Sequence, residues 1–247
     1  MKIVVFGGTG QIGAKLVTLL RASGHEAVAA SRGLGVDALT GEGLDDAVSG
    51  ADVTVDVTNT PPTSAGALQH FFRTATANQL AAARKAGVTH HLVLSIVGAD
   101  KAPGSPYLEA KVAQEEVVAA GGVPFTIVRA TQFFEFAEGI AAAATEGDTV
   151  RLVPTPTQPI AADDVAAALA DLAVSPPRNG ILDLAGPDVI RLDDFVRRYL
   201  EATSDPRRVV GDPAATYFGG GVDGDPLIAG PGGRIAPTHY ADWLAAR

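Results

Sequence analysis

The 247-residue sequence contains no cysteine, which excludes disulfide bonds and thiolate metal sites. Basic residues are also few: 19 Lys and Arg against 28 Asp and Glu give a formal net charge of −9. A general nucleic-acid binder needs a basic face to neutralise phosphates, so the charge excludes that class. The five histidines are scattered, without the spacing of a metal cage. We therefore expect neither a metal site nor a nucleic-acid partner.

Long apolar runs are absent as well. No window approaches the roughly 20 consecutive apolar residues that a membrane span requires. The sequence opens directly on a strand-like segment, which leaves no room for a signal peptide. These observations predict a soluble, cytoplasmic protein with no membrane partner. The sequence leaves open whether the protein forms a homo-oligomer.

What the sequence does contain is a regular alternation of apolar strands and helices. This pattern predicts an α/β fold with a Rossmann-like, doubly wound parallel sheet. We expect a single domain over residues 1–247, in which residues from about 132 to 247 contribute a smaller substrate-binding region. Within it, the Gly- and Pro-rich segment 211–237 is typical of a lid or binding loop. Strands are expected at 2–6, 25–31, 51–60, 90–98 and 124–130, and helices at 11–21, 43–50, 64–86, around 107–111, 163–174 and 192–203.

The stretch "VVFGGTGQIGAKLV" places Gly7, Gly10 and Gly13 between the first strand and the first helix. Glycines there allow a tight turn, close approach of the backbone to a pyrophosphate, and close packing of helix on strand. The N-terminus of the helix then offers N–H groups to the anion. A glycine-rich turn without a ligand is the alternative, but the strand before it and the helix after it favour dinucleotide binding. The loop residues expected to hold the cofactor are Gly7, Thr9, Gly10, Gln11, Ile12 and Gly13.

The end of the second strand, "AVAASRG", indicates which dinucleotide binds. A site that prefers NAD normally carries an acidic side chain there, which binds the ribose 2′-hydroxyl. Ser31 and Arg32 occupy this place, and an arginine can pair with a 2′-phosphate. The alternative for Arg32 is a solvated surface charge. The pair favours NADP(H) over NAD(H).

A third feature is the stretch "SPYLEAK", in which Tyr107 and Lys111 stand four residues apart. Ser105 suits a helix N-cap and Pro106 suits the first turn, so a helix is expected to begin here. Tyr107 and Lys111 then fall on one face of that helix. A tyrosine can donate a proton to a developing alkoxide if its pKa of about 10 is lowered, and a nearby ammonium does this. A surface tyrosine with a solvated lysine is the alternative.

With these features the sequence resembles the short-chain dehydrogenase/reductase superfamily, in particular its atypical, NmrA-like branch. The resemblance covers residues 1 to about 200. It rests on the stretches "GGTGQIG", "VTN", "LVLSIVGAD", "PYLEAKVAQEEVV", "FTIVRATQFFEF", "PIAADDVAAAL" and "LAGPDVIRLDDF".

The resemblance implies a catalytic set of Ser95, Tyr107 and Lys111, in which Lys111 also binds the nicotinamide ribose. It implies that Thr58 and Asn59 lie at the cofactor. Better-known members carry an asparagine on the preceding helix, whereas here Phe72 stands nearer to that place than Asn78 does.

The function predicted from these features is NADPH-dependent reduction of a carbonyl, a ketone or quinone, in a small organic molecule. Phe133 and Tyr217 are candidates for substrate contact. His90 and His91, at the start of the segment 90–98, are expected to be loop residues that precede the buried strand rather than catalysts. Two alternatives stay open. One is an NADP(H)-sensing regulator without catalysis, and the other is a sugar-nucleotide epimerase or dehydratase.

Overall fold

The structure is a computed structural model that describes residues 1–61, 64–101, 104–217 and 227–247. Up to residue 130 its main elements are β1 (Lys2–Phe6), α1 (Gln11–Ala22), β2 (Glu26–Ala30), α2 (Leu44–Val48), β3 (Val53–Asp56), α3 (Ala65–Ala86), β4 (His90–Ile96), α4 (Pro106–Ala120) and β5 (Phe125–Ala130). They are followed by α5 (Ala137–Ala143), β6 (Thr145–Glu146), β7 (Thr149–Leu152), β8 (Pro156–Thr157), α6 (Ala162–Ala173), β9 (Gly180–Ala185), β10 (Ile190–Arg191), α7 (Leu192–Ala202), β11 (Arg208–Gly211), β12 (Arg234–Ile235) and α8 (Tyr240–Ala245).

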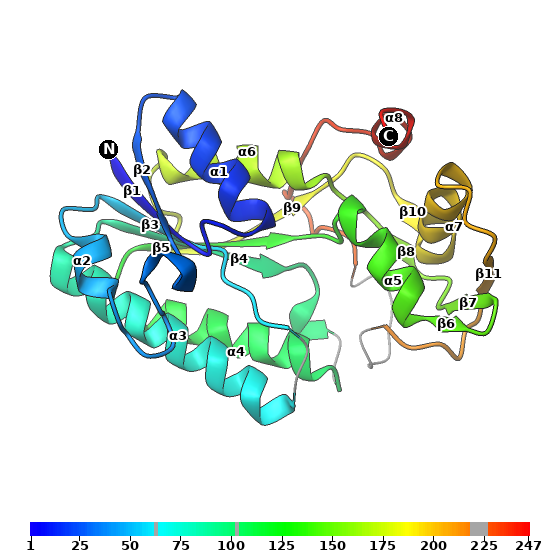
Figure 1. Cartoon of the computed structure of the whole chain (residues 1–247), viewed down its shortest axis with the longest axis horizontal. Helices are drawn as coiled ribbons and strands as arrows, with labels where there is room; N and C mark the ends of the chain where they lie inside the picture. The colour runs from blue at the N-terminus through cyan, green and yellow to red at the C-terminus, as the bar shows by residue number, and fades with distance from the viewer. Residues whose placement is uncertain (62–63, 102–103, 218–226) are drawn as a thin grey trace. The chain divides into compact units, whose positions relative to one another are not determined.

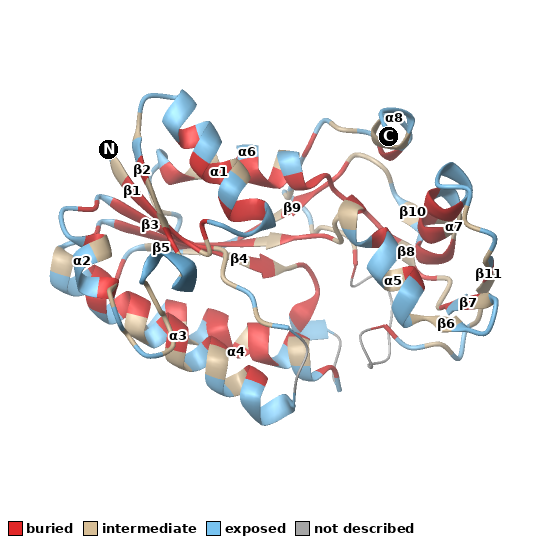
Figure 2. Cartoon of the chain, viewed as in Figure 1, coloured by how far each residue is buried: buried red, intermediate tan, exposed pale blue. Residues whose placement is uncertain are grey.

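A seven-stranded parallel sheet with the order β12-β9-β5-β4-β3-β1-β2 confirms the predicted α/β fold. Figure 1 shows α3 and α4 on one face of this sheet and α1 and α6 on the other. The buried strands lie between these layers, as Figure 2 shows. The strand order reverses between β1 and β3, which lie side by side. Ligands of doubly wound sheets bind outside the carboxyl ends of the strands at such a switch point.

The expected helix boundaries agree with the structure where the sequence carries a capping signal. Ser64 accepts a hydrogen bond from the N–H of Ala67 at the start of α3, and Gly87 ends that helix in the left-handed conformation. Pro106 begins α4, as its place after Ser105 predicts. The expectation of a loop at His90 and His91 is wrong. Both begin β4 and are buried, because their rings hydrogen-bond the Thr126 and Thr54 hydroxyls of the neighbouring strands.

The chain divides into two compact units. Unit 1 comprises Met1–Ser95, Pro106–Arg129 and Val165–Leu182, and unit 2 comprises Ile96–Ser105, Ala130–Asp164 and Asp183–Arg247. Residues 218–226 of the expected lid segment lie outside the described residues. Among the described helices, none is both long and apolar enough to cross a membrane.

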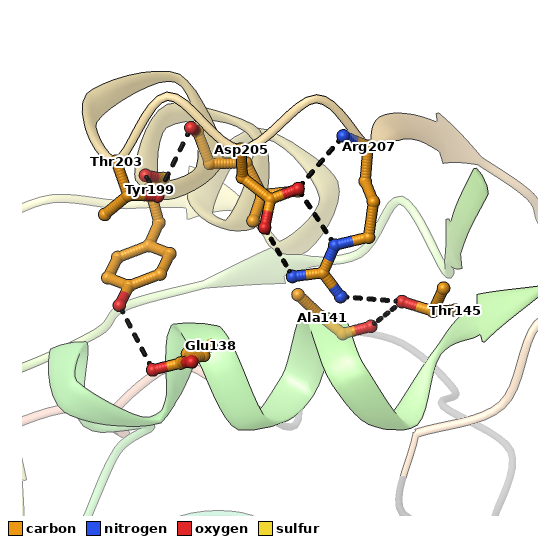
Figure 3. Close-up of polar contacts among 8 residues, drawn as sticks. Glu138, Ala141, Thr145, Tyr199, Thr203, Asp205 and Arg207 are labelled. Atoms are coloured by element: carbon orange, nitrogen blue, oxygen red, sulfur yellow. Dashed lines mark hydrogen bonds and ion pairs between the residues drawn. The ribbon is translucent and has the colours of Figure 1, made fainter. Parts of the chain in front are cut away.

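Unit 2 has its own apolar core, in which Phe134 and Phe195 pack against Tyr240. A set of polar contacts fixes the connection that follows α7 (Figure 3). The Arg207 guanidinium donates two hydrogen bonds to the Asp205 carboxylate, at 2.9 and 2.7 Å, and a third to the Thr145 hydroxyl at 2.9 Å. Thr145 in turn donates to the carbonyl of Ala141 at the end of α5. These contacts join α5 to the segment before β11.

Candidate functional site

The glycine loop between β1 and α1 is too tightly packed for side chains at three of its positions, Gly7, Gly8 and Gly13. A Cβ on Gly13 would lie 2.1 Å from the carbonyl oxygen of Gly7, and one on Gly7 would lie 2.9 Å from the carbonyl oxygen of Val57. Gly7 also has a φ of +77°. Gly10 is the N-cap of α1 and provides no side-chain cap. The first N–H groups of α1 have no partner within the helix, so this turn can accept an anion.

The remaining loop residues line the same turn. Thr9 and Gln11 are exposed, whereas the Ile12 side chain is buried beneath the helix. Contact of Ile12 with a ligand would therefore use its backbone.

Ser31 and Arg32 follow β2 next to the glycine loop, because the N–H groups of Gly7 and Gly8 both bond the carbonyl oxygen of Ala30. The Ser31 hydroxyl oxygen is buried and has no hydrogen-bond partner among the described residues. Arg32 is exposed, and within the described part of the chain no acidic side chain pairs with it. An unpartnered hydroxyl and an exposed guanidinium thus follow β2, the strand end at which a dinucleotide-binding fold holds the adenosine ribose.

The carboxyl end of β3 presents Asp56, Thr58 and Asn59. One oxygen of the buried Asp56 carboxylate accepts hydrogen bonds from the N–H and the hydroxyl of Thr58, at 2.8 and 2.7 Å. Asn59 is exposed, and its amide oxygen accepts from the N–H of Thr60 at 2.8 Å and from the Tyr107 hydroxyl at 3.0 Å. The phenol is therefore held at the end of β3, beside the switch point of the sheet. Burial raises the pKa of Tyr107 above its usual value.

Lys111 lies one turn after Tyr107 and is 4% exposed, which makes it a buried cation rather than a solvated one. Its ammonium donates to the carbonyl oxygen of Leu94 at 2.9 Å and to the amide oxygen of Gln114, and it lies 4.7 Å from the centroid of the Phe72 ring. Burial lowers its pKa to about 8, against the opposing charges of Asp56 and Glu115. Among the described residues two acceptors use two of its three N–H groups, which leaves one for a ligand.

Ser95, the third predicted catalytic residue, is also buried near the end of β4. Its hydroxyl donates to the Glu115 carboxylate at 2.5 Å. Arg129 on β5 donates two further hydrogen bonds to that carboxylate, at 2.9 and 2.6 Å. In the structure the hydroxyl hydrogen of Ser95 therefore points at the buried Glu115 carboxylate.

Three of the remaining sequence candidates have structural partners. Asn78 donates to the carbonyl oxygens of Ala38 and Leu39, so it fixes the loop after β2. Tyr217 lies in the core of unit 2, where its hydroxyl donates to Gln132 at 2.7 Å. Phe133, also in unit 2, stacks on the exposed ring of Phe136 at a centroid distance of 5.3 Å.

Sequence reasoning missed four residues of the buried polar cluster around Lys111: Asp56, Gln114 and Glu115, and Arg129, which binds Glu115. Together with Lys111 they provide two cations and two anions in the interior of unit 1, so the buried charges balance. The available signal was the spacing of Lys111, Gln114 and Glu115, which at i, i+3 and i+4 share one face of α4. A face of that composition is ordinarily solvated, and only its neighbours on β3 and β5 show that it is buried.

The residues present fit a bound NAD(P)H. Adding a Cβ to Gly8 would place it 2.7 Å from the Cα of Ala29, so this part of the loop keeps its backbone bare and close to β2. The orphaned Ser31 hydroxyl and the exposed Arg32 supply the polar groups that the adenosine end requires. Within the described residues no group of three or more His, Asp or Glu is arranged to hold a metal ion.

Comparison with known proteins agrees with this fit. A family model described as NAD(P)H-binding matches residues 7–176. No curated protein matches the sequence significantly. Among solved structures, dTDP-4-dehydrorhamnose reductase from Bacillus anthracis in complex with NADP is 13% identical, with a TM-score of 0.73 over 98% of this chain and 96% of its own.

Two other solved structures show the same fold at similar distance in sequence. MoeE5 in complex with UDP-glucuronic acid and NAD is 20% identical, with a TM-score of 0.70 over 99% of this chain and 93% of its own. The NADPH-dependent quinone oxidoreductase QOR2 from Escherichia coli, complexed with NADPH, is 18% identical, with a TM-score of 0.67 over 86% of this chain and 78% of its own.

Proposed function

The chain belongs to the NAD(P)H-binding family, and we propose that it is an NADPH-dependent reductase that acts on a carbonyl group of a small organic molecule, a ketone or a quinone. The observation that carries the proposal is the position of Tyr107. Its hydroxyl is held at 3.0 Å by Asn59 at the end of β3, with the buried Lys111 one turn behind it on α4. Arg32, exposed beside the glycine loop, supports NADPH rather than NADH as the cofactor.

In this proposal each residue has a defined task. The backbone of the glycine loop and the N-terminus of α1 hold the pyrophosphate, and Ser31 and Arg32 hold the phosphorylated ribose. NADPH, when bound, supplies the hydride for the carbonyl carbon. Tyr107 donates the proton to the substrate oxygen. Lys111 uses its remaining N–H to bind a ribose hydroxyl, and its positive charge lowers the pKa of the phenol against the effect of burial.

Ser95 has a different task from the one that its place in the sequence predicts. The acceptor of its hydroxyl is the buried Glu115 carboxylate, which Arg129 also binds, whereas the acceptor of the Tyr107 hydroxyl is the exposed Asn59. We therefore assign Ser95 to the support of α4 on β4 rather than to the substrate oxygen. In this assignment Tyr107 donates its proton without a residue of β4 that also donates a hydrogen bond to the substrate oxygen. Asn59 takes the place nearest to Tyr107 and orients its hydroxyl.

The experiment that tests the proposal is NADPH oxidation against a panel of ketones and quinones, followed by Tyr107→Phe. Loss of a general acid lowers turnover by about 10²–10⁴-fold, and binding of NADPH should not change. Tyr199→Phe is the matched control, because this hydroxyl contacts Glu138 in unit 2. Full turnover by Tyr107→Phe would contradict the assignment of the proton donor.

A second candidate function is chemistry on a sugar nucleotide. MoeE5, whose structure holds a UDP-sugar, matches 99% of this chain, whereas QOR2 matches 86%. An epimerase or dehydratase regenerates its cofactor within each cycle, so it would convert UDP- or dTDP-sugars without net NADPH consumption. A regulator that only senses NADP(H) would bind the cofactor and consume neither class of substrate. The same panel, extended by these sugar nucleotides, separates the three functions.

A further inference from the structure

A buried glutamine of unit 1, Gln114, is 1% exposed and connects three other buried polar side chains. Its amide oxygen accepts a hydrogen bond from the Lys111 ammonium. Its amide nitrogen donates to the second oxygen of the Asp56 carboxylate at 2.9 Å and to the Thr76 hydroxyl at 3.2 Å. One amide therefore bridges a buried cation and a buried anion.

The orientation of this amide follows from its neighbours. An ammonium has only donors and a carboxylate only acceptors, so the oxygen of Gln114 must face Lys111 and its nitrogen must face Asp56. In the flipped amide, the Gln114 nitrogen would face the Lys111 ammonium, which is also a donor. Its oxygen would face the Asp56 carboxylate, which is also an acceptor. The amide dipole thus lies along the line from cation to anion and stabilises both charges where little water reaches them.

Lys111 needs this support because the interior of the unit opposes its charge. A buried ammonium tends to release its proton unless hydrogen bonds and opposite charges hold it. The charged groups that act on it are Asp56 on β3 and Glu115 on α4. Glu115 is already bound by Arg129 and Ser95, and Asp56 acts on Lys111 through Gln114.

We propose that Gln114 is a positioning residue that acts through Lys111: its amide links the ammonium to the Asp56 carboxylate and so keeps the lysine charged and directed at the site. The inference rests on the function proposed above for Lys111, and it deepens it. Gln114 does not touch the substrate or the cofactor.

The test is a direct measurement of the Lys111 pKa by NMR in protein labelled with ¹³C at the lysine ε-carbons. The chain has only five lysines (Lys2, Lys15, Lys85, Lys101 and Lys111). The signal of Lys111 is assigned by its loss in Lys111→Met. In Gln114→Met the link is removed at similar volume, and the Lys111 pKa should fall by about one unit or more. In Gln114→Glu a carboxylate replaces the amide, and the pKa should rise.

The matched control is Gln79→Met. Gln79 is fully buried on α3, three residues after Thr76, and its amide has no partner among the described residues. Its replacement should leave the Lys111 pKa unchanged, so the control separates a general effect of losing a buried amide from the specific link. The wild-type protein gives a third measurement, because the side-chain ¹⁵N signal of Gln114 should titrate with the midpoint of Lys111.

Opposite shifts in the two Gln114 variants would support the proposal, since a role in packing alone would not change sign with charge. An unchanged Lys111 pKa in either variant, or a Gln114 signal that does not follow Lys111, would overturn it. The proposed function fails separately. If Lys111→Met retains NADPH turnover, the lysine has no part in catalysis, whatever Gln114 does to its pKa.

Discussion

His91 allows a quantitative prediction about stability and pH. The imidazole lies fully buried on β4, with its Nδ1 at 2.8 Å from the Thr54 hydroxyl and its Nε2 without a partner among the described residues. Burial lowers its pKa from 6.5 to about 4, although the nearby Asp56 carboxylate opposes the shift. The ring is therefore neutral in the folded protein at pH values where the unfolded chain already binds a proton.

The sign and size of the effect follow from this difference. Between pH 6.5 and about 4 the unfolded state holds more protons than the folded state, so the free energy of unfolding decreases as the pH falls. Each pH unit in that window corresponds to about 1.4 kcal/mol. Lowering the pH from 6.5 to 5 should therefore remove about 2 kcal/mol of stability through His91 alone.

The assay is urea unfolding at a series of pH values for the wild type, His91→Leu and His70→Gln. His91→Leu will change the absolute stability, so the quantity compared is the slope of the unfolding free energy against pH. The wild type and His70→Gln, in which an exposed histidine of α3 is replaced, should lose about 2 kcal/mol more between pH 6.5 and 5 than His91→Leu does. Parallel curves for all three proteins would refute the reasoning.

Three further predictions concern the loop, the cofactor and the buried ion pair. Gly13→Ala should abolish NADPH binding in a fluorescence titration, since its Cβ would lie 2.1 Å from a backbone oxygen. The control Gly33→Ala, where a Cβ would have nothing within 4 Å, should bind NADPH normally. Equal binding by the two variants would contradict the loop geometry. Arg32→Glu should weaken NADPH by about tenfold or more and spare NADH, and a parallel loss of both would remove the 2′-phosphate assignment. Glu115→Gln should lower the free energy of unfolding in urea by about 3 kcal/mol or more, because it removes the carboxylate that pairs with Arg129 in the interior. A decrease below about 1 kcal/mol would indicate that the pair is solvated.

The parts of the site that the sequence predicts are those formed by local chemistry. The turn after β1 needs glycines for steric reasons that act within a few residues, so Gly7 and Gly13 can be recognised without the fold. The start of α4 is likewise set by Ser105 and Pro106, whose effects are local. Once the first residue of α4 is known, the helical repeat determines which face of α4 carries Tyr107.

The parts that could not be predicted depend on partners that are distant in sequence. Ser95 has the expected place near the end of β4, but its hydroxyl is oriented by Glu115 on a later helix and Arg129 on a later strand. His90 and His91 were expected in a loop before a buried strand, whereas both begin that strand. They do so here with one ring nitrogen of each bonded to a threonine hydroxyl on an adjacent strand, Thr126 for His90 and Thr54 for His91.

The same reasoning explains why α4 can bury three polar side chains on one face. Alone, Lys111, Gln114 and Glu115 would make that face solvated, because an unpaired charge in the interior is strongly unfavourable. Asp56 on β3 and Arg129 on β5 change the outcome, since Arg129 pairs directly with Glu115 and Asp56 is joined to Lys111 through the amide of Gln114. Burial of the lysine is therefore a property of the assembled sheet. A substitution of Asp56 or Arg129 should therefore change the pKa of Lys111 as strongly as a substitution on α4 itself does.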